Sequence, residues 1–264
     1  MKKLISLFLI LLMLSATAAF AAENIDLTTY TDEELEALKV QVAEEIRARK
    51  NARAASPAAD FRYMSNGSEV RIVEYTGKGG NVIIPDTLDG VPVTQIGKDA
   101  FNEYYEVNIL RSITLPAELV SIGDYAFRST YQLEQVLVLP GTLEKIGTGA
   151  FQNSNIHGVV VQSACELGTQ AFDLGDKLQF CYIREGSAAS LGIWAFRDTP
   201  VEVVVIPADV TNISGAAFTG CEKLTIYCPA GSYAEQYCKD NFIVCNTAEY
   251  ENMAAYYEAL YPAD

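Results

Sequence analysis

The chain offers few residues from which an active site could be built, and its histidine content is the tightest restriction. His157 is the only histidine among 264 residues, so a Ser-His-Asp triad or a Cys-His pair would have to be built on it, and a site of several histidines is excluded. No Gly-x-Ser-x-Gly motif presents a nucleophilic serine. Cys165 is the nearest thiol in sequence, but its position in the chain predicts burial rather than the open surroundings of a reactive cysteine.

The other groups that carry chemistry do not form a recognisable site either. Thirty-four acidic residues against 19 lysines and arginines give a formal net charge of −15, and nothing in the scatter of the acidic residues selects a catalytic pair or a calcium loop. The spacing from Cys221 through Cys228 and Cys238 to Cys245 is too loose for a zinc ribbon. So acidic a chain is also a poor ligand for nucleic acid or anionic lipid. We therefore expect a non-enzymatic protein without a catalytic residue, cofactor or metal.

The six cysteines fall into two groups. Cys165 and Cys221 occupy recurring positions where other segments carry an apolar or small residue, and Cys181 lies on a predicted strand. Cys228, Cys238 and Cys245 cluster near the C-terminal end. The sequence leaves open whether a disulfide joins two of these three or whether all are buried thiols.

Residues 1–21 have the three parts of a secretory signal. Lys2 and Lys3 supply the positive charge, residues 4–14 the apolar stretch, and residues 19–21 a small-x-small cleavage site. The apolar stretch is shorter than the roughly 18 residues that a spanning helix needs. No second long apolar run follows, so we expect no integral membrane segment after cleavage and a location outside the cell or on its surface.

Residues 22–60 are predicted to form an N-terminal amphipathic helix and a linker. Thr31 and Glu34 make a capping box, and Leu35, Leu38 and Val42 begin one apolar stripe. This stripe either covers the open end of the following domain or pairs with a second copy. The segment 51–60, rich in alanine with Ser56 and Pro57, reads as the linker.

A short motif repeats six times between residues 96 and 218: an aliphatic residue, a small residue, two variable residues, then Ala-Phe. Successive phenylalanines are 26, 24, 21, 24 and 22 residues apart. Recurrence at such a period is typical of a solenoid of stacked coils. The phenylalanines that end the copies are Phe101, Phe127, Phe151, Phe172, Phe196 and Phe218.

Each copy is preceded by a β-type run, and most runs end in proline, as at Pro116, Pro140 and Pro207. We expect the runs to pair as a parallel sheet, because a proline just after a strand costs no ladder hydrogen bond and turns the chain. A hairpin in residues 61–75 should open the array. The expected fold class is an α+β repeat protein: a solenoid over 61–246 with stacked parallel strands, the N-terminal helix and a short C-terminal helical cap.

The repeat resembles the BspA-like branch of the leucine-rich repeats. The resemblance rests on the six Ala-Phe motifs, the Ile/Val-x-Ile/Leu-Pro strands, the opening segment 84–93 and Phe218-Thr-Gly-Cys221. Gln162, Arg184 and Glu185 depart from the pattern, where proline or apolar residues are usual. The resemblance implies an exported bacterial protein that binds a protein or glycoprotein of host matrix or of other bacteria, and it supplies no ligand.

Strand alternation predicts which residues face outward. Counting back from the end of each run, the residues two and four places earlier should point to solvent, where a polar face is expected. They form instead an apolar column, here called the outward stripe: Val136, Val138, Val160, Ile183, Val203, Val205 and Tyr227. Cys181 falls in the same column.

Three explanations of the outward stripe remain open. It is a partner-binding surface, or its β-branched residues serve strand propensity alone, or the C-terminal tail folds over it. In the tail, 247–264, Tyr250, Met253, Tyr257 and Leu260 predict a short amphipathic helix. We favour a protein-binding, adhesin-like module; the alternative is a structural protein that self-associates through the stripe or the N-terminal helix.

Overall fold

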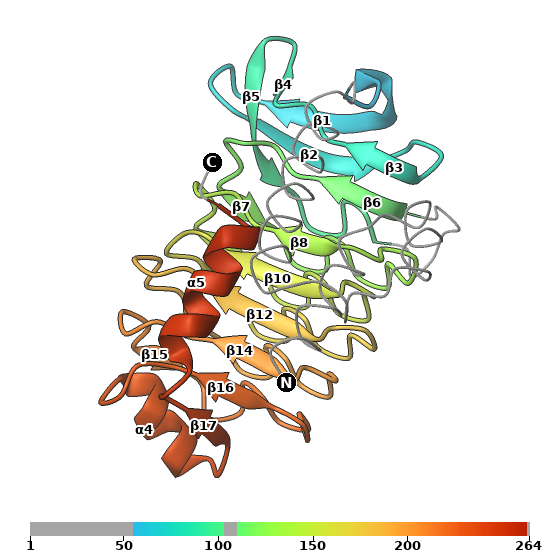
Figure 1. The fold of residues 1–264 in the computed structure, drawn as a ribbon. Coiled ribbons are helices and arrows are strands. Elements are labelled where there is room, and N and C mark those ends of the chain that lie inside the picture. The colour runs from blue at the N-terminus through green and yellow to red at the C-terminus, as the bar shows by residue number, and fades with distance from the viewer. Residues whose placement is uncertain (1–54, 103–109, 263–264) are drawn as a thin grey trace, which may run out of the picture.

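The chain winds into a stack of coils that contribute short parallel strands to two walls (Figure 1). This computed structural model describes residues 55–102 and 110–262. The predicted signal, residues 1–21, and the predicted N-terminal helix lie outside the described residues. Within the described part, the antiparallel hairpin and the parallel strand ladder predicted from the sequence are confirmed.

The first wall is the larger sheet, ordered β1-β2-β5-β7-β9-β11-β13-β15, with β4 paired to β5. Its later members are only two residues long and contain the aliphatic residue of each repeat motif. The strands are β1 Phe61–Ser65, β2 Val70–Tyr75, β4 Thr87–Leu88, β5 Val91–Ile96, β7 Ser121–Ile122, β9 Lys145–Ile146, β11 Glu166–Leu167, β13 Ser190–Leu191 and β15 Asn212–Ile213.

The second wall is a six-stranded parallel sheet ordered β17-β16-β14-β12-β10-β8, and a separate pair, β3-β6, precedes it. The six strands are β8 Val136–Val138, β10 Gly158–Val161, β12 Phe180–Ile183, β14 Val203–Val205, β16 Thr225–Tyr227 and β17 Val244–Asn246; the pair is β3 Gly80–Ile83 and β6 Leu110–Thr114. We call the outer surface of the six-stranded sheet the strand face.

The six repeated phenylalanines form one continuous stack, here called the phenylalanine ladder. Consecutive ring centroids lie 4.8–5.4 Å apart, and each pair is stacked within 17° of parallel. At the first end Tyr75 continues the stack on Phe101 at 5.2 Å, and Phe61 meets Phe101 edge-on. At the last end Tyr237 meets Phe218 edge-on. The phenylalanine ladder is therefore continuous, and further aromatic rings pack on both of its ends.

The small residue of each motif is explained by the closeness of neighbouring coils. A Cβ added to Gly168 would lie 2.5 Å from the carbonyl oxygen of Ile146, and one added to Gly192 would lie 2.7 Å from that of Leu167. The bends themselves use a different position: the residue before Ala-Phe is left-handed in five coils, as at Trp194 with φ 57°. The glycines at the small-residue position of the motif are therefore needed for close approach between coils, since none of their φ angles lies in the left-handed region.

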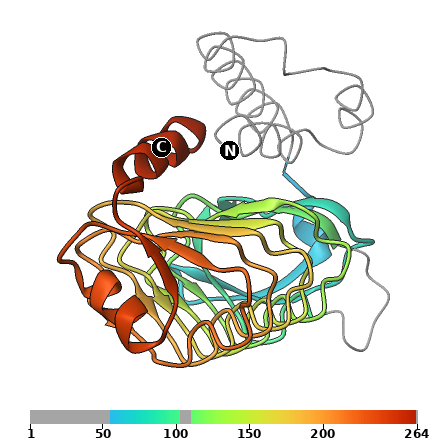
Figure 2. The same cartoon turned by 60° about the horizontal axis from the view of Figure 1, so that its bottom comes forward.

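Two helices follow the last coil. Helix α4, Tyr233–Asp240, begins at Ser232, whose hydroxyl accepts a hydrogen bond from the Glu235 amide. Helix α5, Tyr250–Leu260, follows β17 after three residues. It runs back across the six-stranded sheet and lies on the outside of the coils (Figures 1 and 2).

Candidate functional site

Six of the seven residues of the outward stripe do face outward, where they form a second apolar cluster separate from the main core. Val160 and Val205 are fully buried in it, while Val136, Val138, Val203 and Tyr227 pack against it partly buried. Besides Phe180 and Tyr182 of β12, the cluster contains residues of α5 and the adjoining Tyr261, so the cover from outside the solenoid wall comes from the C-terminal helix. The strand face is thus apolar and covered.

Two residues predicted to face outward, Ile183 and Cys181, point inward instead. Both belong to the main core and are at most 1% exposed. The reason is the register of β12: Tyr182 pairs with Val160 and with Val205, so this strand ends one residue earlier than predicted. Neither Arg184 nor Glu185 is a proline that would mark the end of the strand.

The aromatic residues Phe180 and Tyr182 take the outward places on β12, and α5 packs on them. The Tyr257 ring stacks on Tyr182 with centroids 5.3 Å apart and lies 5.1 Å from Phe180. Tyr257 is 1% exposed and sits at the centre of the interface. The apolar side of α5 also includes Tyr250, a half-buried Met253 and a buried Leu260. Residues 250, 253, 257 and 260 share one helical face, which explains why this side docks.

Polar contacts fix the position of α5 at the edge of this apolar interface. Arg184 donates to a Glu258 carboxylate oxygen at 2.9 Å and to the backbone carbonyl of Tyr261. The Tyr182 hydroxyl donates to the other Glu258 oxygen at 2.9 Å. Burial and this hydrogen bond raise the pKa of Tyr182, so the hydroxyl remains a donor at neutral pH. The contacts fix one orientation of the helix on the strand face.

Of the three explanations of the outward stripe, covering by the C-terminal tail describes this arrangement. The sequence identified the tail residues Tyr250, Met253, Tyr257 and Leu260, but missed Phe180, Tyr182 and Arg184 on the strand face. A register counted from Val160 rather than from the missing proline would have found them. The site is therefore an apolar strand face that accommodates an amphipathic helix.

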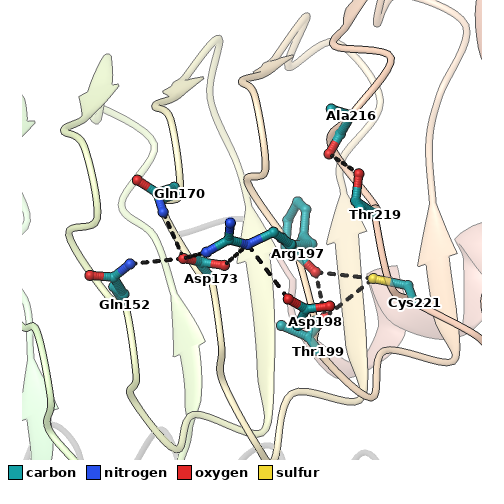
Figure 3. Close-up of polar contacts among 10 residues, drawn as sticks. Gln152, Gln170, Asp173, Arg197, Asp198, Thr199, Ala216, Thr219 and Cys221 are labelled. Carbon is teal, nitrogen blue, oxygen red and sulfur yellow. Dashed lines mark hydrogen bonds and ion pairs between the residues drawn. The ribbon is translucent and has the colours of Figure 1, made fainter.

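A second polar cluster, centred on Asp173, joins neighbouring coils (Figure 3). The buried Asp173 carboxylate forms a two-pronged ion pair with Arg197, both hydrogen bonds measuring 2.8 Å. The side-chain amides of Gln152 and Gln170 donate to the same carboxylate at 2.8 and 2.9 Å. The Arg197 guanidinium lies over the Trp194 ring. Because each carboxylate oxygen accepts bonds from the chain itself, this cluster joins three coils.

Burial shifts the pKa values of the isolated thiols and of the histidine in the solenoid. Burial raises the pKa of the Cys165 and Cys181 thiols to about 12, and burial lowers the pKa of His157. His157 precedes β10 and Cys165 follows it, at opposite ends of the strand. Within the described residues, no group of three or more histidine, cysteine or acidic side chains is arranged to hold a metal ion. None of the helices described there combines the length and apolarity that crossing a bilayer demands.

The stacked parallel coils and the phenylalanine ladder define a leucine-rich-repeat solenoid. Residues 91–225 match the family model described as a BspA type leucine rich repeat region, in six copies. The chain belongs to the BspA-type leucine-rich repeat family, as the resemblance predicted. No curated protein matches it.

Solved structures similar to the chain include three leucine-rich proteins. A leucine rich cell surface protein from Faecalibacterium prausnitzii A2-165 is 24% identical, with a TM-score of 0.46 over 68% of this chain; the match spans only 55% of that protein. A leucine rich repeat protein from T. pallidum is 19% identical, with 74% of this chain and 99% of that chain covered and a TM-score of 0.36. A leucine-rich repeat protein from Bacteroides ovatus ATCC 8483 is 17% identical, covering 75% and 69% of the two chains, with a TM-score of 0.29.

Proposed function

We propose that the chain is an exported, non-enzymatic, adhesin-like module that binds a protein or glycoprotein of host matrix or bacterial surface through its strand face. Membership of a repeat family whose members usually mediate protein interactions supports a binding role. The binding residues on this proposal are Val136, Val138, Val160, Val203, Val205 and Tyr227. Ile183 leaves the set because it faces the core.

The observation that carries the proposal is the docking of α5. An isolated apolar surface says little about its partner, but this one already holds an amphipathic helix by a central tyrosine and a rim arginine. A central aromatic anchor surrounded by polar contacts is the usual arrangement of a helix-in-groove interface. A partner segment of the same character fits the same face.

Because α5 occupies the strand face, a partner must displace it. The observed affinity is then lower than the affinity of the open face, by the fraction of molecules in which α5 is undocked. Weakening the docking of α5 should therefore strengthen binding, whereas damage to the strand face should abolish it. We therefore expect substitutions in α5 to raise the affinity for the partner, and substitutions in the strand face to lower it.

The test measures binding of the mature chain, residues 22–264, to immobilised matrix glycoproteins and bacterial surface proteins. Tyr257→Lys places a charge in the docked interface and should open the face, raising affinity roughly tenfold to a hundredfold, as 1.4–2.8 kcal/mol of lost docking implies. Ala255→Lys puts the same charge on the exposed side of α5 and is the matched control. Val138→Lys combined with Val205→Lys, added to Tyr257→Lys, should remove the binding.

Circular dichroism must show that each variant keeps its fold. Equal binding by the Tyr257→Lys and Ala255→Lys variants would show that α5 does not control access. Retained binding in the triple variant would place the ligand on another surface, and the proposal would be wrong. If the Tyr257→Lys variant instead gains mass with concentration and binds nothing on the panel, the strand face is a self-association surface.

A further inference from the structure

Three thiols from three different elements meet at the C-terminal end of the solenoid. Cys228 directly follows β16, Cys238 lies on α4, and Cys245 is the middle residue of β17. The sulfurs of Cys228 and Cys245 are 3.3 Å apart, and Cys238 also hydrogen-bonds to the Cys228 sulfur. All six cysteines are free thiols in this structure. Elsewhere in the described residues, no two cysteine side chains form a hydrogen bond with each other.

The three thiols differ in exposure and in acidity. Cys228 and Cys238 are at most 1% exposed, whereas Cys245 is partly exposed. Hydrogen bonds from Cys238 and Cys245 lower the pKa of Cys228 to about 6. The hydrogen bond to Cys228 raises the pKa of Cys238, and burial raises that of Cys245. The buried Cys228 sulfur, whose pKa is lowered, therefore contacts Cys245, the one thiol of the three that solvent can reach.

We propose that this cluster is a thiol–disulfide exchange site in which Cys245 and Cys228 form a disulfide and Cys238 positions Cys228. The oxidant is a disulfide, either a small molecule such as oxidised glutathione or a disulfide-bearing oxidoreductase. Forming the bond brings the two sulfurs together by only about 1 Å, since a disulfide measures about 2.0 Å. This site is separate from the strand face, and its existence does not depend on the proposed binding function.

The exchange balances in two steps. Cys245 gives up its proton and attacks the donor disulfide, which forms a mixed disulfide on Cys245 and releases one donor thiolate that takes up a proton. Cys228 then gives up its proton and attacks the Cys245 sulfur, which releases the second donor thiolate to be protonated in turn. The protein gains one disulfide and the donor is reduced to two thiol equivalents.

The disulfide would fix β17, the strand that precedes α5, to the last coil. Strand β17 lies at the edge of its sheet, where its recorded backbone pairing is with β16. Residues 247–249 link it to α5. A bond from Cys245 to Cys228 therefore fixes covalently the point from which α5 reaches the strand face. Reduction leaves that point to backbone hydrogen bonds and packing.

The experiment uses the full mature chain, reduced, freed of reductant and then incubated in glutathione buffers of increasing oxidised fraction. Free thiols are counted, and the bonded peptides are identified by mass spectrometry. We expect two of the six thiols to be lost and the bond to join Cys228 and Cys245. Cys245→Ser should abolish the loss, while Cys221→Ser, outside the cluster, should leave it unchanged.

Two further measurements separate a positioning role from a merely structural one. Cys238→Ala should slow oxidation at neutral pH at least tenfold by removing a hydrogen-bond donor to Cys228, and Cys238→Ser, which keeps a donor, should restore the rate. Hydrogen exchange of residues 244–260 should slow at least threefold on oxidation. Retention of all six thiols, or a bond between another pair, overturns the site. Equal exchange in both states overturns the anchoring of α5.

Discussion

Truncation of Phe151 to alanine tests whether the phenylalanine ladder holds the coils together. The side chain is fully buried, and its ring lies 4.9 Å from that of Phe127 and 5.4 Å from that of Phe172, within 9° of parallel to both. Removal of a buried phenylalanine costs about 3–5 kcal/mol. Each stacked pair contributes ~0.5–1.5 kcal/mol beyond burial, and two pairs are lost. We therefore expect a loss in the free energy of unfolding near the upper limit, about 5 kcal/mol.

The assay is urea unfolding followed by circular dichroism. A loss of about 5 kcal/mol approaches the whole stability of many domains, so Phe151→Leu provides a milder variant in which the transition can still be measured. Tyr131→Ala, which removes an aromatic ring that is 51% exposed, should cost under about 1 kcal/mol. A loss below about 2 kcal/mol for Phe151→Ala, or one equal to that of Tyr131→Ala, would refute the role assigned to the ladder.

Three other predictions concern single groups. Burial raises the pKa of Tyr257 well above its usual value of 10, so docking of α5 is favoured while the phenol is neutral and weakens as the pH rises above 10. Phenolate absorbance should then appear together with faster hydrogen exchange in α5. Ionisation without faster exchange would contradict this prediction. Asp173→Asn leaves the Arg197 guanidinium without its carboxylate and should lower the free energy of unfolding by about 3 kcal/mol, measured by urea unfolding. This is the low end for a buried ion pair, because the Arg197 side chain is a quarter exposed. An unchanged unfolding midpoint would show the pair to be dispensable. Gly168→Ala, which forces a methyl group against the coil below, should cost about 1–3 kcal/mol, whereas Gly141→Ala meets open space and should be neutral or slightly stabilising in the same assay.

The sequence predicts the solenoid well because the same residue types recur once in every coil. Every coil must place one large ring above another, so Ala-Phe recurs, and the strands before it share its phase. The prediction of outward-facing residues failed at β12, where no proline marks the end of the strand. Without a proline after β12, the count slipped by one residue, and a slip of one reverses which side chains face outward. Ile183 and Tyr182 exchanged places for that reason.

From the sequence, covering by the C-terminal tail was one of three possible explanations of the outward stripe, and nothing in the sequence favoured it over the other two. An amphipathic tail shows that a helix needs an apolar surface, and it does not show which surface the helix reaches. That choice depends on the three-residue link after β17 and on the aromatic pair Phe180 and Tyr182, which the register error concealed. The meeting of Cys228, Cys238 and Cys245 likewise depends on how α4 and β17 return to the last coil.

The position of α5 also changes how the solenoid should come apart. A stack of coils is bound by nearest-neighbour interfaces, so its ends can fray while its middle stays folded. Helix α5 belongs to one apolar cluster with residues of β8, β10, β12, β14 and β16, which links coils that do not otherwise touch. Fraying from the C-terminal end must then break contacts with several coils together. The helix makes the covered part of the stack a single cooperative unit, and leaves the β3-β6 end as the part free to unfold on its own.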